Sequence, residues 1–443
     1  ALIVILAAVS CSRLPRPTPN ATESFWLVDA PFQDTRTTSD LPAFSDVVVI
    51  GAGMTGASTS WHLLKQQTAN ISVTLLDARG VSAGATGRNG GHLHPSQDVS
   101  FQTWAHTFGI STAKAALKFE ERNNELLLGF IKQENIDAEA VLDGAVDLLM
   151  TIDEVAKRRQ SLEFYRAQGP PAVDVDWWDR KEVQRRMHTN KFLAGANTPT
   201  AGQFWPARVV FKLAELALQL GLNLQTRTEA LEVKEGHNEI EVLTSRGTIR
   251  CKDVVFATNA YTGGIVSELE VGITPVTNQV VSTLPLPTVL WNYTSSSDED
   301  YYYLHQRPSD RRIILGGARD VVPGKRVGIF DDSSLNAAMS EALSTYVSRI
   351  YPQVDPVIDR EWAGVLGFTE GELPFVGPLS GQRNRNGRWV AAGYSGQGMT
   401  KTFLAGKVIS EFILHGRPHD VFVEDFLPSR RLAKKTAVDE RYI

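Results

Sequence analysis

Asp46-Val-Val-Val-Ile50 and Gly51-Ala-Gly-Met-Thr-Gly56 are adjacent in the chain and together decide the fold. The first segment is a short run of mostly β-branched apolar residues, which is typical of a strand buried on both faces of a parallel sheet. The second has the spacing G-x-G-x-x-G, and a helical pattern follows it to about Gln67. Glycines in this order allow a tight turn and let the backbone approach a pyrophosphate, which the helix N-terminus attracts.

A second expected strand covers 72–77 and ends on Asp77. This carboxylate comes about 20 residues after Gly56, where an acidic side chain takes the ribose hydroxyls of a dinucleotide. Strand, glycine turn, helix, strand and acid in this order predict a dinucleotide site rather than an isolated tight turn. The fingerprint itself is compatible with both NAD and FAD.

Two further glycine clusters favour a flavin. The first, at 84–95, reads as an extended loop along a flat ligand, because glycine is unfavourable inside helices and strands. The second, at 393–399, follows a short expected strand at 389–392 and opens a helix. The N-terminus of that helix would stabilise the negative charge of a reduced flavin. An enzyme that uses only NAD has no need of this distant loop, so we expect FAD.

The composition is that of an ordinary globular protein. The chain has 443 residues, of which 42% are hydrophobic and 21% charged, so it can bury a large core. Its net charge of −5 gives no general attraction to nucleic acid. The cysteines are Cys11 and Cys251, which excludes a disulfide framework and a Cys-rich zinc site, and we expect no metal.

The N-terminal residues leave the location of the protein open. The apolar run at 1–10 is too short to span a bilayer, and we expect no integral membrane segment. Residues 1–12 are either the remnant of a signal peptide, which implies the secretory pathway, or part of a helix packed on the domain of a cytoplasmic protein. The oligomeric state is open as well.

The order of these motifs resembles the FAD-dependent D-amino-acid oxidase superfamily, which includes glycine oxidase, sarcosine oxidase and γ-glutamylputrescine oxidase. The resemblance extends from about Asp46 to about Leu414 and also rests on the segments 202–206, 251–261, 301–317 and 362–377. The γ-glutamylputrescine oxidase-like branch is the most similar. Its features are Thr86-Gly-Arg-Asn-Gly-Gly91, Ala257-Thr-Asn-Ala-Tyr261 and the Trp-x-Gly…Thr…Pro-x-x-Gly pattern that begins at Trp362.

The resemblance implies an α/β (α+β) fold. A Rossmann-like FAD-binding domain of the glutathione-reductase type would be interleaved with an antiparallel-sheet substrate domain. The FAD-binding domain is expected at 46–105, 195–275 and 360–420, and the substrate domain at 106–194 and 276–359. An N-terminal arm (1–45) and a C-terminal tail (421–443) complete the expected division.

The resemblance also implies a reaction. A primary or secondary amine, in its neutral form, gives a hydride to flavin N5, and water hydrolyses the resulting imine to a carbonyl compound and an amine or ammonia. Dioxygen is the expected acceptor and hydrogen peroxide the product. The alternatives are a flavin amine dehydrogenase with another acceptor, an NAD-dependent dehydrogenase, and a non-enzymatic flavin-binding module.

The resemblance assigns the site residue by residue. The residues expected beside the reacting atoms are His92, Arg88, Tyr303 and Trp362. Those expected to bind the cofactor are Gly51, Gly53, Met54, Thr55, Gly56, Asp77, Ala78, Arg79, Gly84, Ala85, Thr86, Arg88, Asn89, Gly90, Gly91, His92, Leu93, Val233, Ala257, Thr258, Asn259, Gly364, Gly393, Gly396, Gln397, Gly398, Met399 and Thr400. Tyr301, Tyr303 and His305 share one face of an expected strand, which is either a wall of the substrate cavity or core.

The chain departs from the family pattern at Leu366, and also at Thr400, which stands where sarcosine oxidase has a substrate-binding lysine. Leu366 stands where glycine and D-amino-acid oxidases carry an arginine for the substrate carboxylate, and where monomeric sarcosine oxidase has the cysteine bonded to flavin. We therefore expect non-covalent FAD with no cysteinyl linkage, whereas a histidyl linkage stays open. A substrate carboxylate would need another cation, and the candidates are Arg88, Arg307 and Lys401.

Overall fold

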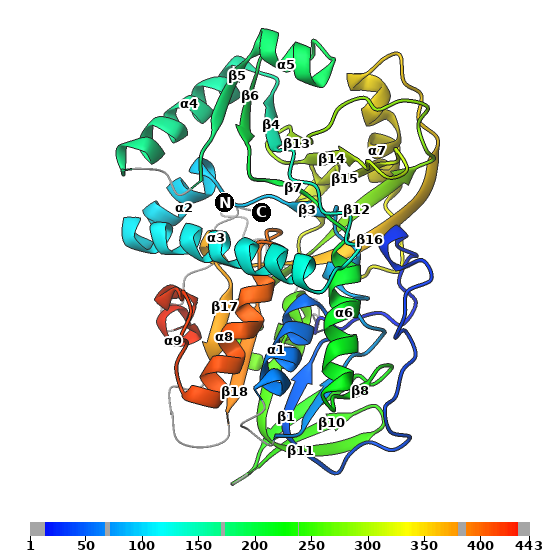
Figure 1. Ribbon diagram of the computed structural model, residues 1–443, viewed down its shortest axis with the longest axis vertical. Coiled ribbons are helices and arrows are strands. Elements are labelled where there is room, and N and C mark those ends of the chain that lie inside the picture. Colours follow the sequence, from blue (N-terminus) through cyan, green and yellow to red (C-terminus); the bar gives the residue numbers. More distant parts are fainter. Residues whose placement is uncertain (1–13, 67–70, 170–172, 238, 380–386, 433–443) are drawn as a thin grey trace, which may run out of the picture.

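The computed structural model describes residues 14–66, 71–169, 173–237, 239–379 and 387–432, which form two eight-stranded sheets (Figure 1). In the view of Figure 1 the first sheet lies in the lower half of the molecule and the second in the upper half, with α2 (Asp98–Phe108) and α3 (Ile110–Gln133) between them. The apolar run at residues 1–10 lies outside the described residues.

The first sheet is built around β1 (Phe44–Ile50), which pairs in parallel with β2 (Val73–Leu76) and β11 (Gly247–Phe256). Two more parallel strands flank these, β8 (Asn223–Gln225) on β2 and β18 (Arg388–Ala392) on β11. Antiparallel strands complete the sheet: β9 (Ala230–Glu235), β10 (Ile240–Thr244) and β17 (Phe375–Pro378). The last four residues of β1 are buried, as its β-branched sequence predicts.

Three helices pack beside this sheet: α1 (Met54–Lys65), α6 (Pro206–Gln219) and α8 (Thr402–His415). Helix α6 begins with Pro206, whose fixed φ suits the first helical position. Helix α3 packs against α8, and Phe130 of α3 contacts Phe403 of α8. The long helix that the sequence places in the substrate domain therefore shares the hydrophobic core of the first sheet and its helices.

The second sheet has the order β16-β12-β15-β14-β13-β4-β6-β5, antiparallel except for the parallel pair β13–β4. Helix α7 (Ala337–Ile350) packs on β12 and β15. The strands are β4 (Ala145–Leu149), β5 (Asp176–Asp179), β6 (Ala194–Thr198), β12 (Thr274–Thr283), β13 (Thr294–Ser297), β14 (Tyr302–Gln306), β15 (Ile313–Gly317) and β16 (Ile358–Phe368).

Shorter elements connect and cover the sheets. The helices not yet described are α4 (Ile152–Ala167), α5 (Arg180–Met187) and α9 (Pro428–Arg431), and β3 (His92–Leu93) pairs with β7 (Gly202–Gln203). The 3-10 helices are η1 (Phe25–Leu27), η2 (Ala85–Gly87), η3 (Asn259–Gly264), η4 (Ser267–Leu269), η5 (Arg319–Val321), η6 (Pro323–Arg326), η7 (Glu370–Glu372) and η8 (Glu424–Phe426).

In three places the sheets and the packing of the helices extend across the boundaries of the expected division. Strand β16 belongs to the second sheet, although 360–420 was expected in the FAD-binding domain, because it pairs along its whole length with β12. Strand β6, at the expected boundary near residue 195, also belongs to the second sheet. The third place is α3, described above.

Both chain ends that the structure describes are packed rather than loose. Trp26 in the N-terminal arm is 1% exposed, and its indole donates a hydrogen bond to the carbonyl oxygen of Asn89. Near the other end, Phe426 is fully buried and Arg431 donates to backbone oxygens of Glu370, Leu373 and Pro374. The arm thus lies against the second glycine cluster.

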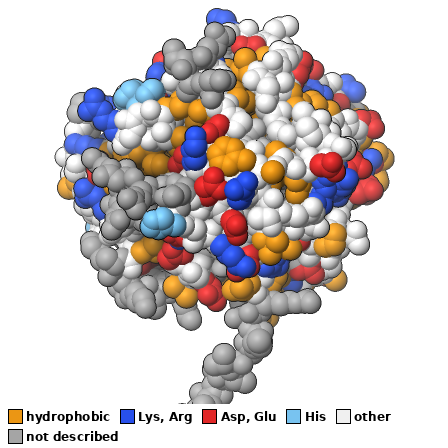
Figure 2. All heavy atoms as spheres, turned by 90° about the horizontal axis from the view of Figure 1, so that it is seen from below, with side chains coloured by type: hydrophobic (Ala, Val, Ile, Leu, Met, Phe, Trp, Pro, Cys, Tyr) orange, Lys and Arg blue, Asp and Glu red, His pale blue; other side chains and the backbone are white. Residues whose placement is uncertain are grey.

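The surface agrees with the balanced composition. On the face that Figure 2 shows, basic and acidic side chains are interspersed, which gives no field of a single sign there. Within the described ranges, no helix combines the length and the apolar character that crossing a bilayer requires.

Candidate active site

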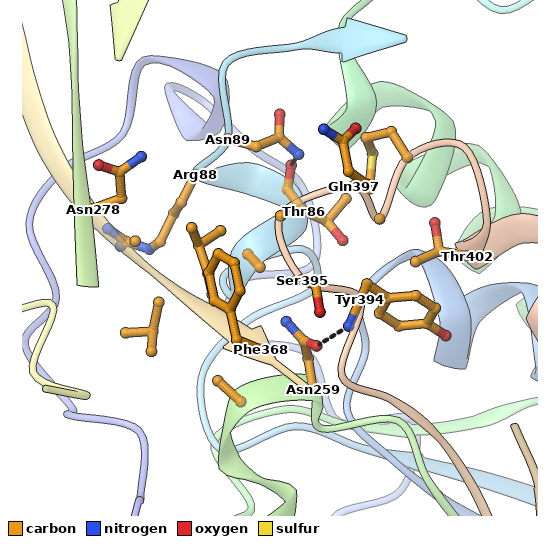
Figure 3. Close-up of a pocket in the computed structure, with 18 of the residues that line it drawn as sticks. Thr86, Arg88, Asn89, Asn259, Asn278, Phe368, Tyr394, Ser395, Gln397 and Thr402 are labelled. Atoms are coloured by element: carbon orange, nitrogen blue, oxygen red, sulfur yellow. Dashed lines mark hydrogen bonds between the residues drawn. The ribbon is translucent and has the colours of Figure 1, made fainter. Parts of the chain in front are cut away.

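A cavity of about 640 Å³ is lined by residues from both sheets, and its size suits a small-molecule or cofactor site. Figure 3 shows its labelled lining residues, which come from segments far apart in the chain. The three glycine clusters that the sequence singles out all contribute to its wall. The three segments that the sequence predicts to share one cofactor therefore border one continuous cavity.

The first glycine cluster forms a tight turn between β1 and α1. A Cβ atom on Gly51 would lie 2.5 Å from the carbonyl oxygen of Ala257, and Gly51 has a φ of +106°. A Cβ atom on Gly56 would collide with the carbonyl oxygen of Gly51. Helix α1 starts after Gly53, which has no side chain to cap the free N–H groups, and its first turn carries no acidic residue. The exposed helix dipole favours an anion in the cavity at this point.

Asp77 lies at the end of β2, next to this turn. Its two carboxylate oxygens accept hydrogen bonds from the backbone N–H groups of Ala52, at 2.8 Å, and Arg79, at 2.7 Å. Burial raises the pKa of Asp77, while these donors and the nearby arginine oppose that shift. Gly51, Gly53 and Asp77 all line the cavity, so the residues present fit the phosphate and ribose groups of a dinucleotide.

The second glycine cluster is held by Arg88. The guanidinium donates to the carbonyl oxygens of Ala83 and Ala363, each at 2.9 Å, and lies 3.7 Å from the carboxylate of Asp332. Burial lowers the pKa of Arg88 to about 10. The indole of Trp362 donates to the backbone oxygen of Arg88 at 2.9 Å. Arg88 lines the cavity, but its guanidinium fastens the loop to β16.

The third glycine cluster is joined by hydrogen bonds to Asn259 and to Thr55 of helix α1. The side-chain oxygen of Asn259 accepts from the N–H groups of Gly393 and Tyr394, and the second of these bonds is the dashed line in Figure 3. The hydroxyl of Tyr394 lies 2.9 Å from that of Thr55 on α1. Helix α8 begins only at Thr402, so the segment 393–401 is a loop that faces the cavity instead of a helical turn.

His92 and His305 share one acceptor. His92 Nδ1 lies 3.2 Å and His305 Nε2 lies 2.8 Å from the carbonyl oxygen of Gly90, which makes these nitrogens the protonated ones. The rings are 5.3 Å apart. Burial lowers the pKa of His92 to about 4 and that of His305 well below its usual value, so both are neutral near pH 7. His92 Nε2 is buried without a hydrogen-bond partner.

Tyr303 forms part of the wall on the second sheet. Its hydroxyl accepts a hydrogen bond from the side-chain amide of Asn278 at 2.9 Å, and burial raises its pKa to about 12. A Cβ atom on Gly90 would lie 2.5 Å from its ring, and one on Gly316 would collide with it from the neighbouring strand. The tyrosine is therefore fixed as a neutral phenol between two glycines, and the expected face of Tyr301 and Tyr303 lines the cavity.

Two of the cations expected to bind a substrate carboxylate are paired with carboxylates of the protein itself. Arg307 pairs with Glu139 at 2.9 Å and with Asp310 at 3.0 Å, and Lys401 forms a fully buried ion pair with Glu120. Neither Arg307 nor Lys401 lines the cavity.

Most of the cofactor residues expected from the sequence line the cavity, but six of the expected site residues do not. These are Gly56, Gly91, Leu93, Val233, Gly393 and Trp362. Gly56 and Gly91 act through packing, since a side chain there would collide with Gly51 or crowd Phe204 and Trp26. Trp362 is fully buried beside Trp26, so it supports the wall without forming it. The residues that reach the cavity here are Ala230, the first residue of β9, and the preceding Glu229, instead of Val233.

The structure adds polar residues that no motif predicts. On the side of the cavity formed by β4 and β13, Arg158 pairs with Asp98 at 3.0 Å and with Asp147 at 2.8 Å. Burial and Asp147 raise the pKa of the neighbouring Asp300, and burial raises the pKa of Glu372. Asn278 and Arg319 line the cavity from the second sheet. Among the described residues, no cluster of His, Cys, Asp and Glu has the arrangement of a metal site.

Comparisons with known proteins support a flavin site. A family model described as FAD dependent oxidoreductase matches residues 46–412. The chain is 27% identical to gamma-glutamylputrescine oxidoreductase of Escherichia coli, over 83% of each chain. It is 26% identical to a probable oxidoreductase, OrdL, of Rhizobium meliloti, over 84% of this chain and 83% of that protein. The crystal structure of glycine oxidase from Geobacillus kaustophilus superposes with a TM-score of 0.72 at 20% identity, covering 88% of this chain and 99% of that one.

Proposed function

The chain belongs to the FAD dependent oxidoreductase family, and we propose that it oxidises the C–N bond of a primary or secondary amine with FAD bound in the cavity between the two sheets. The observation that carries the proposal is the convergence of three glycine clusters on one cavity that also reaches the aromatic and acidic side chains of the second sheet. The similarity to an oxidoreductase of γ-glutamylputrescine supports an amine as the substrate.

The residues present suit FAD along the length of the cavity. Gly51 and Gly53 would lie against the pyrophosphate at the N-terminus of α1, and Asp77 would accept the ribose hydroxyls. The segments 84–90 and 396–400 would lie along the ring system. Bound there, FAD supplies a two-electron acceptor for a hydride.

We expect the flavin to be held without a covalent bond. Cys251 lies on β11 with its side chain fully buried, does not line the cavity, and has its pKa raised to about 12 by burial. A thiol in this state is a poor nucleophile. The ring nitrogen Nε2 of His92, which lines the cavity, has no hydrogen-bond partner, so acid precipitation of the protein tests both forms. Free flavin in the supernatant supports our expectation, and flavin retained in the pellet indicates a histidyl bond.

In this proposal, side chains that line the cavity bind and orient the substrate. The side of the cavity formed by Asp147, Asp300 and Glu372 offers carboxyl oxygens that accept hydrogen bonds from an amine. Closer to the second glycine cluster, His92 and Tyr303 are themselves buried and neutral, and desolvation there favours the neutral amine needed for hydride loss. Positioning and exclusion of water would carry much of the rate enhancement, without an ionised acid or base.

The acceptor of the electrons is proposed to be dioxygen, which would be reduced to hydrogen peroxide. The test is to reduce the purified protein anaerobically with an amine and then to admit air. Rapid return of the oxidised flavin spectrum together with peroxide supports an oxidase. Slow return, with fast turnover on an artificial acceptor, would make the protein a dehydrogenase. If the purified protein carries and binds no flavin, the proposed function fails.

A further inference from the structure

Arg319 is the cation in the cavity wall that forms no ion pair with any residue the structure describes. The cavity-lining cations in the described chain also include Arg16, Arg79, Arg88 and Arg158, and each of these lies within 4 Å of a carboxylate. Arg319 has no ion pair and no side-chain hydrogen bond among the described residues, and its Nη1 is buried. A buried donor without a partner costs free energy. Binding of a hydrogen-bond acceptor in the cavity by this guanidinium would recover that free energy.

The backbone before Arg319 directs it towards the cavity. Gly317 and Ala318 both have positive φ values, +119° and 61°, and the N–H of Ala318 donates to the carbonyl oxygen of Tyr301 at 2.7 Å. A left-handed conformation is unfavourable for alanine, and such strain is commonly stored at functional sites. The turn at the end of β15 is thus fixed in a shape that holds Arg319 at the cavity wall.

The surroundings of Arg319 are apolar and aromatic. The guanidinium carbon lies 5.4 Å from the centre of the Phe368 ring and 5.9 Å from that of Tyr301. Burial lowers the pKa of Arg319, although the group stays charged at neutral pH. Phe368 lies two residues after Leu366 on β16, and a Cβ atom on Gly396 of the third glycine cluster would lie 3.9 Å from its ring. Arg319 therefore approaches the region where the glycine loop and the second sheet meet.

We infer that Arg319 binds an anionic group of the substrate, a carboxylate in the first instance, so that the substrate is an amino acid or an N-substituted amino acid rather than a simple amine. This inference rests on the proposed function. Asp147, which pairs with Arg158, and Asp300, whose pKa burial and Asp147 raise, line the same cavity and offer carboxyl oxygens to the amino group of such a substrate. A guanidinium binds a carboxylate through two parallel hydrogen bonds, which an ammonium cannot reproduce.

The test compares Arg319→Gln and Arg319→Lys with the unaltered holoprotein. Benzoate and its neutral isostere benzamide serve as probes, and their binding is measured from the perturbation of the flavin spectrum. We expect Arg319→Gln to weaken benzoate binding by about 10- to 100-fold and to leave benzamide unchanged, with Arg319→Lys in between. Arg349→Gln, which removes an exposed arginine on α7, is the matched control and should bind benzoate normally.

Turnover gives a second readout. Anaerobic flavin reduction is compared for alanine and ethylamine, and for N-methylalanine and N-methylethylamine, which differ by the carboxylate. Arg319→Gln should slow reduction by the acids at low concentration and leave the amines within about threefold. Equal losses for acids and amines, or benzoate binding that does not change, would overturn the role of Arg319. Flavin that is bound but reduced by none of the substrates contradicts the proposed function instead.

Discussion

Arg88 and Trp362 are joined by a hydrogen bond, and a second bond, from Arg88 to Ala363, runs in the opposite direction between the second glycine cluster and β16. The indole of Trp362 donates to the backbone oxygen of Arg88, and the guanidinium of Arg88 donates to the backbone oxygen of Ala363, both at 2.9 Å. Thr22 of the N-terminal arm joins them, because its hydroxyl accepts from the N–H of Ala363 and from Arg88. Two residues expected at the reacting atoms therefore fix the second glycine cluster to β16.

Replacing Trp362 by Phe tests this positioning role. The backbone oxygen of Arg88 would lose a buried donor, so we expect the protein to lose about 1–3 kcal/mol of unfolding free energy and to bind FAD more weakly. Urea unfolding and flavin titration of the apoprotein measure the two effects. Trp389→Phe also loses an indole hydrogen bond, to Asp253, but away from the cavity. It should lower stability without changing FAD affinity, and equal FAD affinities in both variants would contradict the role of Trp362.

The first glycine turn should not tolerate a methyl group. In Gly56→Ala the new Cβ atom would meet the carbonyl oxygen of Gly51, so β1 and α1 would have to separate. We expect purified Gly56→Ala protein to contain little or no flavin and to unfold at a lower temperature. Gly129→Ala is the control, since Gly129 is exposed on α3 and a Cβ there meets no atom within 4 Å. That change should leave the unfolding free energy unchanged or raise it by up to about 1 kcal/mol. Full flavin content in Gly56→Ala would refute this account of the turn.

The buried ion pair of Lys401 and Glu120 predicts strong coupling between two substitutions. Lys401→Met leaves the Glu120 charge buried without its cation, and we expect a loss of about 3–5 kcal/mol of unfolding free energy. The carboxylate of Glu120 also accepts two hydrogen bonds from Ser96. The double variant Lys401→Met, Glu120→Gln removes both charges and keeps acceptor oxygen for Ser96. It should be more stable than Lys401→Met alone, whereas additive losses in the double-mutant cycle would exclude the coupling.

Stability should fall as the pH is lowered, in part because His92 and His305 are buried in their neutral forms. Their pKa values are near 6.5 in the unfolded chain and lower in the folded protein, about 4 for His92. Below about pH 6.5 the unfolded chain binds protons that the folded protein does not, so the unfolding free energy decreases with decreasing pH. Each such histidine contributes a slope of up to about 1.4 kcal/mol per pH unit.

Urea unfolding between about pH 7 and pH 5 measures this slope. Variant His305→Gln should show a shallower dependence than the unaltered protein, because one titrating group is removed. Exposed His106 provides the control, and His106→Gln should keep the original slope. A slope that is the same in all three proteins would show that His305 is not buried in its neutral form.

The sequence predicts the cofactor half well because its signals are local. A β-branched run, a glycine turn and a terminal acid are neighbours in the chain, and β1, α1 and Asp77 are found where they are expected. The three glycine clusters also predict that one ligand connects distant segments, and the shared cavity confirms that they meet.

The sequence does not predict which basic side chains are ion-paired, because the carboxylates that pair with them lie far away in the chain. Arg88 lies near Asp332, and Lys401 pairs with Glu120, so nearness to a glycine motif says nothing about whether a charge is free. Arg319 carries only a weak signal, a charged residue directly after the apolar strand and glycines at 313–318. Long-range pairing of β12 with β15 and β16 places it beside Phe368, and no local pattern records that pairing.

The central claim is that the cavity holds an FAD that takes two electrons from a C–N bond. Anaerobic titration of the purified protein with an amine or amino acid, followed through the visible flavin absorbance, tests it most directly. The account predicts complete bleaching at one substrate molecule oxidised per flavin, with the carbonyl product released in the same ratio. A flavin that keeps its oxidised spectrum through a panel of polyamines, N-methyl amino acids and D- and L-amino acids would contradict it.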